Sequence, residues 1–217
     1  MMTQRDLEPG AALPLPRVGS RKVVLLLALM SVIWATLMDQ FGEAAIYWIM
    51  GPYALAVAAT LLTLRGGSLR PTPRLVGLGV LAGGLMTAAT YPAFQLANRL
   101  FPELAQHVAM LYRESHEETL WIAVAWTLVI LTAEELLWRG AWIDALAPRL
   151  GSAGAAALSV VIYAITQFGS GSLVVLVLAA CCGGMWAMLR VTTDSLVPSL
   201  VAHAIWTPTV ILLVPVV

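Results

Sequence analysis

The sequence predicts an all-α fold, a polytopic transmembrane helix bundle. Hydrophobic residues make up 60% of the 217 residues and charged residues only 11%, and the mean hydropathy is +0.86. A soluble domain has about half of its residues apolar and about a quarter charged. The apolar residues also form long runs, and a helix needs roughly 20 of them to cross about 30 Å of hydrocarbon. We therefore expect a multi-pass protein of the cell membrane, with the lipid bilayer as its surroundings.

Seven apolar runs predict about seven spans, and one amphipathic stretch predicts a helix at the membrane surface. The first 22 residues are polar and proline-rich, so we expect a cytosolic arm before a single membrane domain over residues 23–217. The stretch 98–119 mixes apolar and charged residues at helical spacing, which is typical of interfacial helices. The expected spans cover about 23–38, 44–64, 75–97, 119–147, 152–169, 172–190 and 195–216.

Small residues in two of these runs indicate packing rather than chemistry. Gly79 and Gly83 are four residues apart, a spacing that lets membrane helices approach closely. Cys181 and Cys182 are neighbours without a CxxC partner, so we interpret them as small residues of a membrane helix.

Basic residues are distributed unevenly between the two sides of the predicted bundle. Ten of the twelve lie on the side of the N-terminus, and only Arg99 and Arg113 lie on the other. The positive-inside rule then predicts a cytosolic N-terminus and an external C-terminus, and we expect a bacterial inner membrane. The net charge is zero and no basic tract is interleaved with aromatic residues, which argues against nucleic acid as a partner.

Three charged residues interrupt the fourth run. The stretch TAEELLWRG contains Glu134, Glu135 and Arg139. Each ionisable residue near the middle of a membrane helix costs about 2.5–3.5 kcal/mol, whereas each large aliphatic residue returns only about 0.3–0.6 kcal/mol. A helix that ended before Glu134 would avoid this cost, but the good helix former AWIDALA follows and no strong breaker appears before Pro148.

The three charges are therefore expected inside the bilayer, where ionisable side chains mark functional sites. Glu134 lies 14 residues before Pro148, which is about 21 Å along a helix. Glu135 and Arg139 are four residues apart with the acid first, so we expect a structural ion pair. Glu134 is rotated by about 100° from Glu135 and is left as the candidate general base, which takes a proton from water.

Two later segments complete a pattern that EELLWR begins. EELLWR has the form EExxxR. YAITQ has the spacing of a second motif, FxxxH, with Tyr163 in place of the Phe and Gln167 in place of the His. HAIWT has the spacing of a third motif, HxxxN, with His203 retained and Thr207 in place of the Asn. With these motifs, residues 115–210 resemble the CPBP family, the CAAX proteases and bacteriocin-processing proteins, also called Abi or type II CAAX prenyl endopeptidase-like proteins. Tyr163 in place of the Phe of the motif is interpreted as a small change at an aromatic packing position.

The resemblance implies an intramembrane endopeptidase of the glutamate type that cleaves a membrane-associated peptide or protein, either prenylated or a leader peptide. Glu134 would activate water, Gln167 would occupy the assisting position, and His203 with Thr207 would support the oxyanion. The number of residues on each side of the turn agrees with this assignment. Gln167 lies 15 residues beyond Ser152 on an antiparallel run, so the chain there has returned to the level of Glu134. His203 and Thr207, four residues apart, share a helix face.

No cofactor and no metal are expected. Only His203 of the three histidines lies in a span, and the sequence contains no HExxH, whereas a zinc site normally needs three protein ligands. The polar residues of the surface helix have no metal-ligand spacing and are interpreted as a solvated face; they are His107, His116, Glu117 and Glu118.

Two alternatives stay open. The amide of Gln167 cannot accept a proton, so a catalytically impaired family member that binds a membrane peptide or partner protein without cutting it is the first alternative. Intramembrane acids also mark proton relays, so a proton-coupled transporter that uses Glu134 is the lesser one. No inverted repeat of hydropathy is visible, which disfavours the transporter.

Overall fold

The computed structural model describes residues 21–41, 46–65, 69–115 and 118–217, and these ranges are helical almost throughout, without strands. The predicted all-α helical bundle is confirmed. Three of the helical pieces are π-helices (η2, η3 and η5), and η4 is one short 3-10 turn. In chain order the elements are α1 (Arg21–Phe41), η2 (Ile46–Met50), α2 (Gly51–Arg65), α3 (Pro73–Leu100), α4 (Leu104–Ser115), α5 (Leu120–Glu134), η3 (Glu135–Trp142), α6 (Ile143–Gln167), η4 (Phe168–Ser170), α7 (Leu173–Thr193), α8 (Val197–Pro208) and η5 (Thr209–Leu213).

Within the described residues, each predicted apolar run lies mainly on helix, with two corrections at the ends; residues 44 and 45, the start of the second run, lie outside the described residues. Arg21 and Lys22, assigned to the polar arm, are the first residues of α1, and the rest of the arm, residues 1–20, lies outside the described residues. The helix expected to end before Pro148 continues through it and breaks at Gly151, where φ is 69° and ψ is 168°. Glycine adopts a positive φ without the clash of a Cβ atom, so the turn occurs there and not at the proline.

Four helices in the described ranges are long and apolar enough to cross a membrane, which supports a membrane protein. They are Arg21–Gln40, Pro73–Leu100, Leu120–Ser170 and Leu173–Thr193, and Tyr47–Thr63 and Val197–Leu213 are shorter apolar helices. Leu120–Ser170 has 51 residues and turns back at Gly151, so it contains two of the predicted runs. The number of complete crossings and the side of the N-terminus stay predictions.

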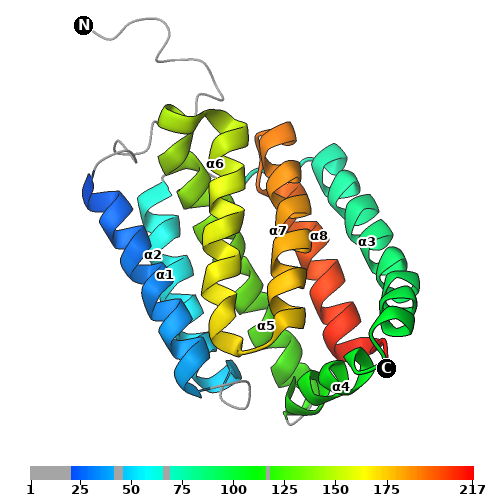
Figure 1. Ribbon diagram of the computed structural model, residues 1–217. Coiled ribbons are helices and arrows are strands. Elements are labelled where there is room, and N and C mark those ends of the chain that lie inside the picture. Colours follow the sequence, from blue (N-terminus) through cyan, green and yellow to red (C-terminus); the bar gives the residue numbers. More distant parts are fainter. Residues whose placement is uncertain (1–20, 42–45, 66–68, 116–117) are drawn as a thin grey trace, which may run out of the picture.

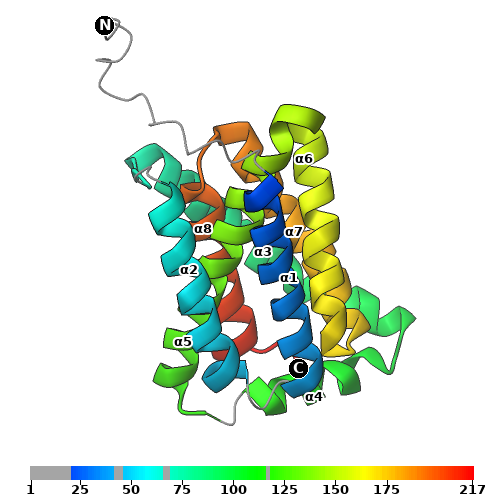
Figure 2. The same cartoon turned by 90° about the vertical axis from the view of Figure 1, so that its left-hand side faces the viewer.

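The helices run alongside one another in a bundle (Figure 1), and α4 lies across the end where the chain finishes (Figure 2). The middle of the amphipathic stretch, Leu104–Ser115, is therefore a helix, as predicted. Tyr112 on α4 anchors it, because its hydroxyl donates to the carbonyl oxygen of Val210 at 2.8 Å.

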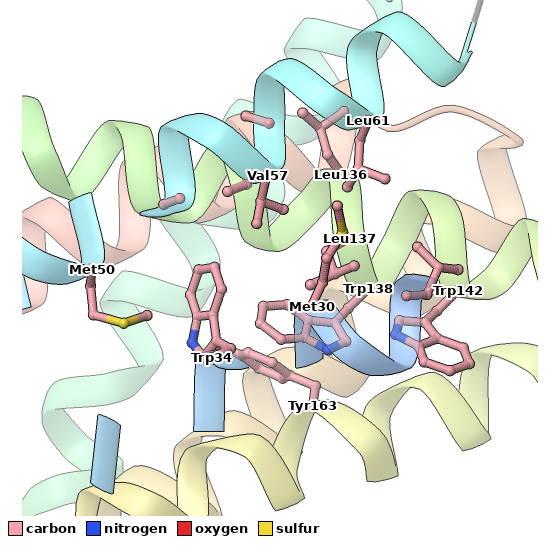
Figure 3. Close-up of a cluster of buried hydrophobic side chains, with 14 of the residues drawn as sticks. Met30, Trp34, Met50, Val57, Leu61, Leu136, Leu137, Trp138, Trp142 and Tyr163 are labelled. Carbon is pink, nitrogen blue, oxygen red and sulfur yellow. The ribbon is translucent and has the colours of Figure 1, made fainter. Parts of the chain in front are cut away.

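The largest apolar cluster surrounds η3 and joins it to α1, α2 and α6 (Figure 3). Trp138 is fully buried, and the centroid of its ring lies 4.9 Å from that of Trp34 on α1, edge to face. On another face of the same π-helix, Leu136 and Leu137 pack toward α2. The charged residues that precede and interleave these apolar side chains are consequently held at the centre of the bundle.

Two glycines bring α3 into close contact with α8. A Cβ atom added at Gly79 would lie 2.7 Å from the Cβ of Val201, and one added at Gly83 would lie 2.9 Å from the carbonyl oxygen of Ala202. Both distances are shorter than a real Cβ atom tolerates, so the close approach predicted from the sequence is confirmed. The contact fixes the position of α8 beside Ala202, whose neighbour is His203.

We expect Gly83→Val to destabilise the bundle by about 1–3 kcal/mol, since its side chain would push α8 away from α3. Gly84→Val is the matched control, because a Cβ atom at Gly84 meets nothing within 4 Å. The midpoints of thermal unfolding in detergent measure both effects. Equal midpoints for the two variants would contradict the close packing of α3 on α8.

Candidate active site

The helix changes its winding at the two adjacent acids. The α-helix α5 ends at Glu134, and Glu135 begins the π-helix η3. Wider π turns are rare and occur frequently at functional sites. Only 7% of Glu134 and 1% of Glu135 and of Arg139 are exposed, so the three charges lie inside the bundle.

Glu134 is contacted by residues from two other helices. The Nε2 of Gln167 on α6 donates a hydrogen bond to its Oε1 at 3.1 Å. The hydroxyl of Tyr163, one turn earlier on α6, donates to its Oε2 at 3.3 Å. The Nε2 of His203 on α8 lies 3.7 Å from the same Oε2. Three of the four residues predicted to form the site, Glu134, Gln167 and His203, are thus together.

Glu135 faces His203 more closely than it faces Arg139. Its Oε1 lies 3.0 Å from the Nδ1 of His203 and 3.7 Å from the Nη1 of Arg139. The ion pair predicted with Arg139 is therefore present, but the sequence reasoning missed the histidine as the nearer partner. An ionised carboxylate only accepts hydrogen bonds, so this contact assigns a hydrogen to Nδ1 of His203.

Aromatic rings hold the arginine and the histidine. The guanidinium carbon of Arg139 lies 4.3 Å from the ring centroid of Tyr163 and 5.3 Å from that of Trp186. Trp186 also stacks on His203, with 3.5 Å between the centroids and 18° between the planes. A Cβ atom at Gly183 would lie 2.7 Å from Nη2 of Arg139, so a larger residue there would displace the guanidinium. Trp186 and Gly183 belong to no recognised motif, which is why the sequence reasoning missed them.

Thr207 lies one helical turn after His203 on α8. Its hydroxyl oxygen is buried, and in the described part of the chain it has no hydrogen-bond partner. The structure therefore does not join Thr207 to the carboxylates.

The polar residues near α4 lie apart from this cluster. The Nδ1 of His107 is 2.9 Å from the carbonyl oxygen of Glu103, and Trp48 donates from Nε1 to Glu118 at 2.6 Å. His116 and Glu117 lie outside the described residues. Among the residues that the structure describes, no group of three or more His, Cys, Asp or Glu side chains could hold a metal ion.

Residues 116–208 match the family model described as Type II CAAX prenyl endopeptidase Rce1-like. The matched segment contains both acids, the α6 residues that contact Glu134, and His203. This match supports membership of the CAAX protease, or CPBP, family. The match supports the general function of a CAAX-type intramembrane protease, a class that works on peptides in a lipid bilayer. The helices α1, α2 and α3 precede the matched segment, and no characterised protein and no solved structure matches the chain.

Proposed function

We propose that this CPBP member is an active intramembrane endopeptidase in which Glu134 activates the attacking water. The convergence of Glu134, Gln167 and His203 from three helices on one buried cluster supports the proposal. Among these groups the Glu134 carboxylate can accept a proton, and the amide of Gln167 can orient the carboxylate but cannot accept a proton itself. The proposed substrate is a membrane-associated peptide, prenylated or a leader sequence.

The proposed roles leave the buried cluster without net charge. If Glu134 and Glu135 are both ionised, Arg139 and a doubly protonated His203 offset them, and the buried cluster is neutral. His203 then donates from Nδ1 to Glu135 and carries its second hydrogen on Nε2, on the side of Glu134. The stacked ring of Trp186 keeps the imidazole in that plane.

The proposed reaction begins when Glu134 takes a proton from water and the water oxygen bonds to the scissile carbonyl carbon. The carbonyl oxygen becomes an oxyanion, which accepts hydrogen bonds from Nε2 of His203 and from the free hydroxyl of Thr207. One such donor contributes about 10²–10³ in rate. The carbon–nitrogen bond then breaks as Glu134 returns its proton to the leaving amide nitrogen, which restores the carboxylate.

The proposal is tested with the full chain in liposomes and two fluorogenic peptides, one ending in a farnesylated CAAX sequence and one leader-like. We expect one of the two peptides to be cleaved. We also expect the orientation of the active protein in the liposome membrane to agree with the proposed cytosolic N-terminus. A wild-type protein that cleaves neither peptide would contradict the proposal for these substrate classes. Flux of protons into the liposomes that depends on Glu134, without cleavage, would favour a transporter instead.

Gln167→His is expected to raise the rate of cleavage by up to about 10-fold, because an imidazole beside Glu134 adds a second proton acceptor. The comparison of kcat for the variant and the wild type measures this effect. It also tests the second candidate function, a peptide-binding protein that does not cut, which the amide at this position favours. A silent wild type with an active Gln167→His variant would support that candidate.

A further inference from the structure

We infer that Tyr163 is a positioning residue, which orients the Glu134 carboxylate together with Gln167. The inference rests on the proposed function and deepens it by adding a residue to the catalytic machinery. The sequence reasoning interpreted Tyr163 as a packing residue, and this interpretation is incomplete, because the hydroxyl contacts the candidate base.

Each oxygen of the Glu134 carboxylate has its own donor from α6. Tyr163 and Gln167 are four residues apart, so both side chains lie on one face of that helix. The tyrosine hydroxyl donates to Oε2 and the amide donates to Oε1. Two donors on two different oxygens restrain the rotation of the carboxylate about its last bond more than a single donor would, and this torsion is otherwise broad.

The tyrosine hydroxyl is itself held in position by the surroundings of its ring. The ring centroid of Trp138 lies 4.7 Å away on one side, and the guanidinium of Arg139 lies 4.3 Å from the ring. On α7, a Cβ atom at Gly183 would come within 3.0 Å of the ring. Only 5% of Tyr163 is exposed. A rigid ring delivers a hydroxyl at a fixed point, which is what orientation of a reacting group requires.

The chemistry of the two α6 residues explains why both are needed. In the motif that the chain resembles, an aromatic residue without a hydroxyl is followed by a histidine. Here the tyrosine adds one donor, and the glutamine keeps a donor but cannot take up a proton. Glu134 is then the remaining proton acceptor on this side of the cluster, and its ability to take a proton from water depends on the orientation of its carboxylate.

Tyr163→Phe is the direct test, because it removes the hydroxyl and keeps the ring. With the farnesylated fluorogenic peptide in liposomes, we expect kcat to fall by about 10- to 100-fold. KM should change by less than about two-fold, since Tyr163 contacts Glu134 and not the substrate. Tyr53→Phe is the matched control: its hydroxyl donates to the carbonyl oxygen of Met30 at 2.6 Å, so an equal loss of a hydrogen bond should leave kcat unchanged.

Rescue separates positioning from a general structural effect. The double variant Tyr163→Phe with Gln167→His restores the aromatic-and-histidine pair of the motif, so we expect Gln167→His to raise kcat by a larger factor in the Tyr163→Phe background than in the wild type. A purely structural role of the hydroxyl predicts the same factor in both backgrounds. If Tyr163→Phe retains the kcat of an active wild type, the inference is overturned.

A spectroscopic measurement keeps the inference independent of cleavage. The infrared band of the Glu134 carboxyl group is identified by its loss in Glu134→Gln, and we expect Tyr163→Phe to shift it while Tyr53→Phe does not. If the wild type cleaves no peptide, the proposed function fails, and the shifted band alone still supports the orienting contact. An unchanged band in Tyr163→Phe overturns the inference whatever the activity.

Discussion

Glu134→Gln is expected to abolish cleavage of the farnesylated peptide and to leave the helix bundle folded. The amide has the shape of the carboxylate, and its oxygen can still accept a hydrogen bond from Gln167. It cannot, however, take a proton from water. Since a general base contributes about 10²–10⁴ in rate, kcat should fall by at least this factor. The measurement is kcat in liposomes, together with the thermal midpoint of the same preparation.

The control for this variant is Glu103→Gln, an identical chemical change at an exposed position between α3 and α4. It should alter neither kcat nor the midpoint by a measurable amount. A Glu134→Gln protein that is folded and still cleaves within a few-fold of the wild type would remove Glu134 as the base. The proposed function would fail with it, because no other described carboxylate shares its contacts with Gln167 and Tyr163.

Much of the fold follows from hydropathy, because a membrane helix needs a long apolar run and little else. The expected run 75–97 corresponds to α3 (Pro73–Leu100), and the expected run 172–190 corresponds to α7 (Leu173–Thr193). Helix length also carries information about depth. Counting residues backward and forward from the turn that follows α5 and η3 predicted that Gln167 and Glu134 lie at the same height along the bundle. The two side chains are hydrogen-bonded in the structure.

The parts that were missed depend on contacts between helices that are distant in sequence. No residue pattern signals that η3 winds as a π-helix, since its apolar residues would suit an α-helix equally well. The pairing of Glu135 with His203 joins residues 68 positions apart, and the spacing of Glu135 and Arg139 pointed only to the local partner. The prediction for Tyr163 as a packing residue was incomplete for a related reason: the sequence does not show which group accepts the hydrogen bond of its hydroxyl.

Arg139→Met is expected to have the largest effect on stability. The variant keeps a long side chain between Tyr163 and Trp186 but removes the positive charge from a position with 1% exposure. The two buried carboxylates are then left with the His203 imidazolium as their one cation, and breaking a buried ion pair in this way costs about 3–5 kcal/mol. The thermal midpoint in detergent should fall accordingly, whereas Arg99→Met, in the last turn of α3, should change it little, as surface substitutions do.

The double variant Glu135→Gln with Arg139→Met identifies the cause of this loss. Removing both charges leaves no unpaired ion in the bundle, so the double variant should be more stable than Arg139→Met alone. The amide oxygen of the new Gln can still accept the hydrogen bond from Nδ1 of His203, which keeps that ring oriented. If the losses of stability in the single variants Glu135→Gln and Arg139→Met simply add in the double variant, the arginine stabilises the bundle through its contacts with the aromatic rings. Its attraction to Glu135 across 3.7 Å would then be the smaller contribution.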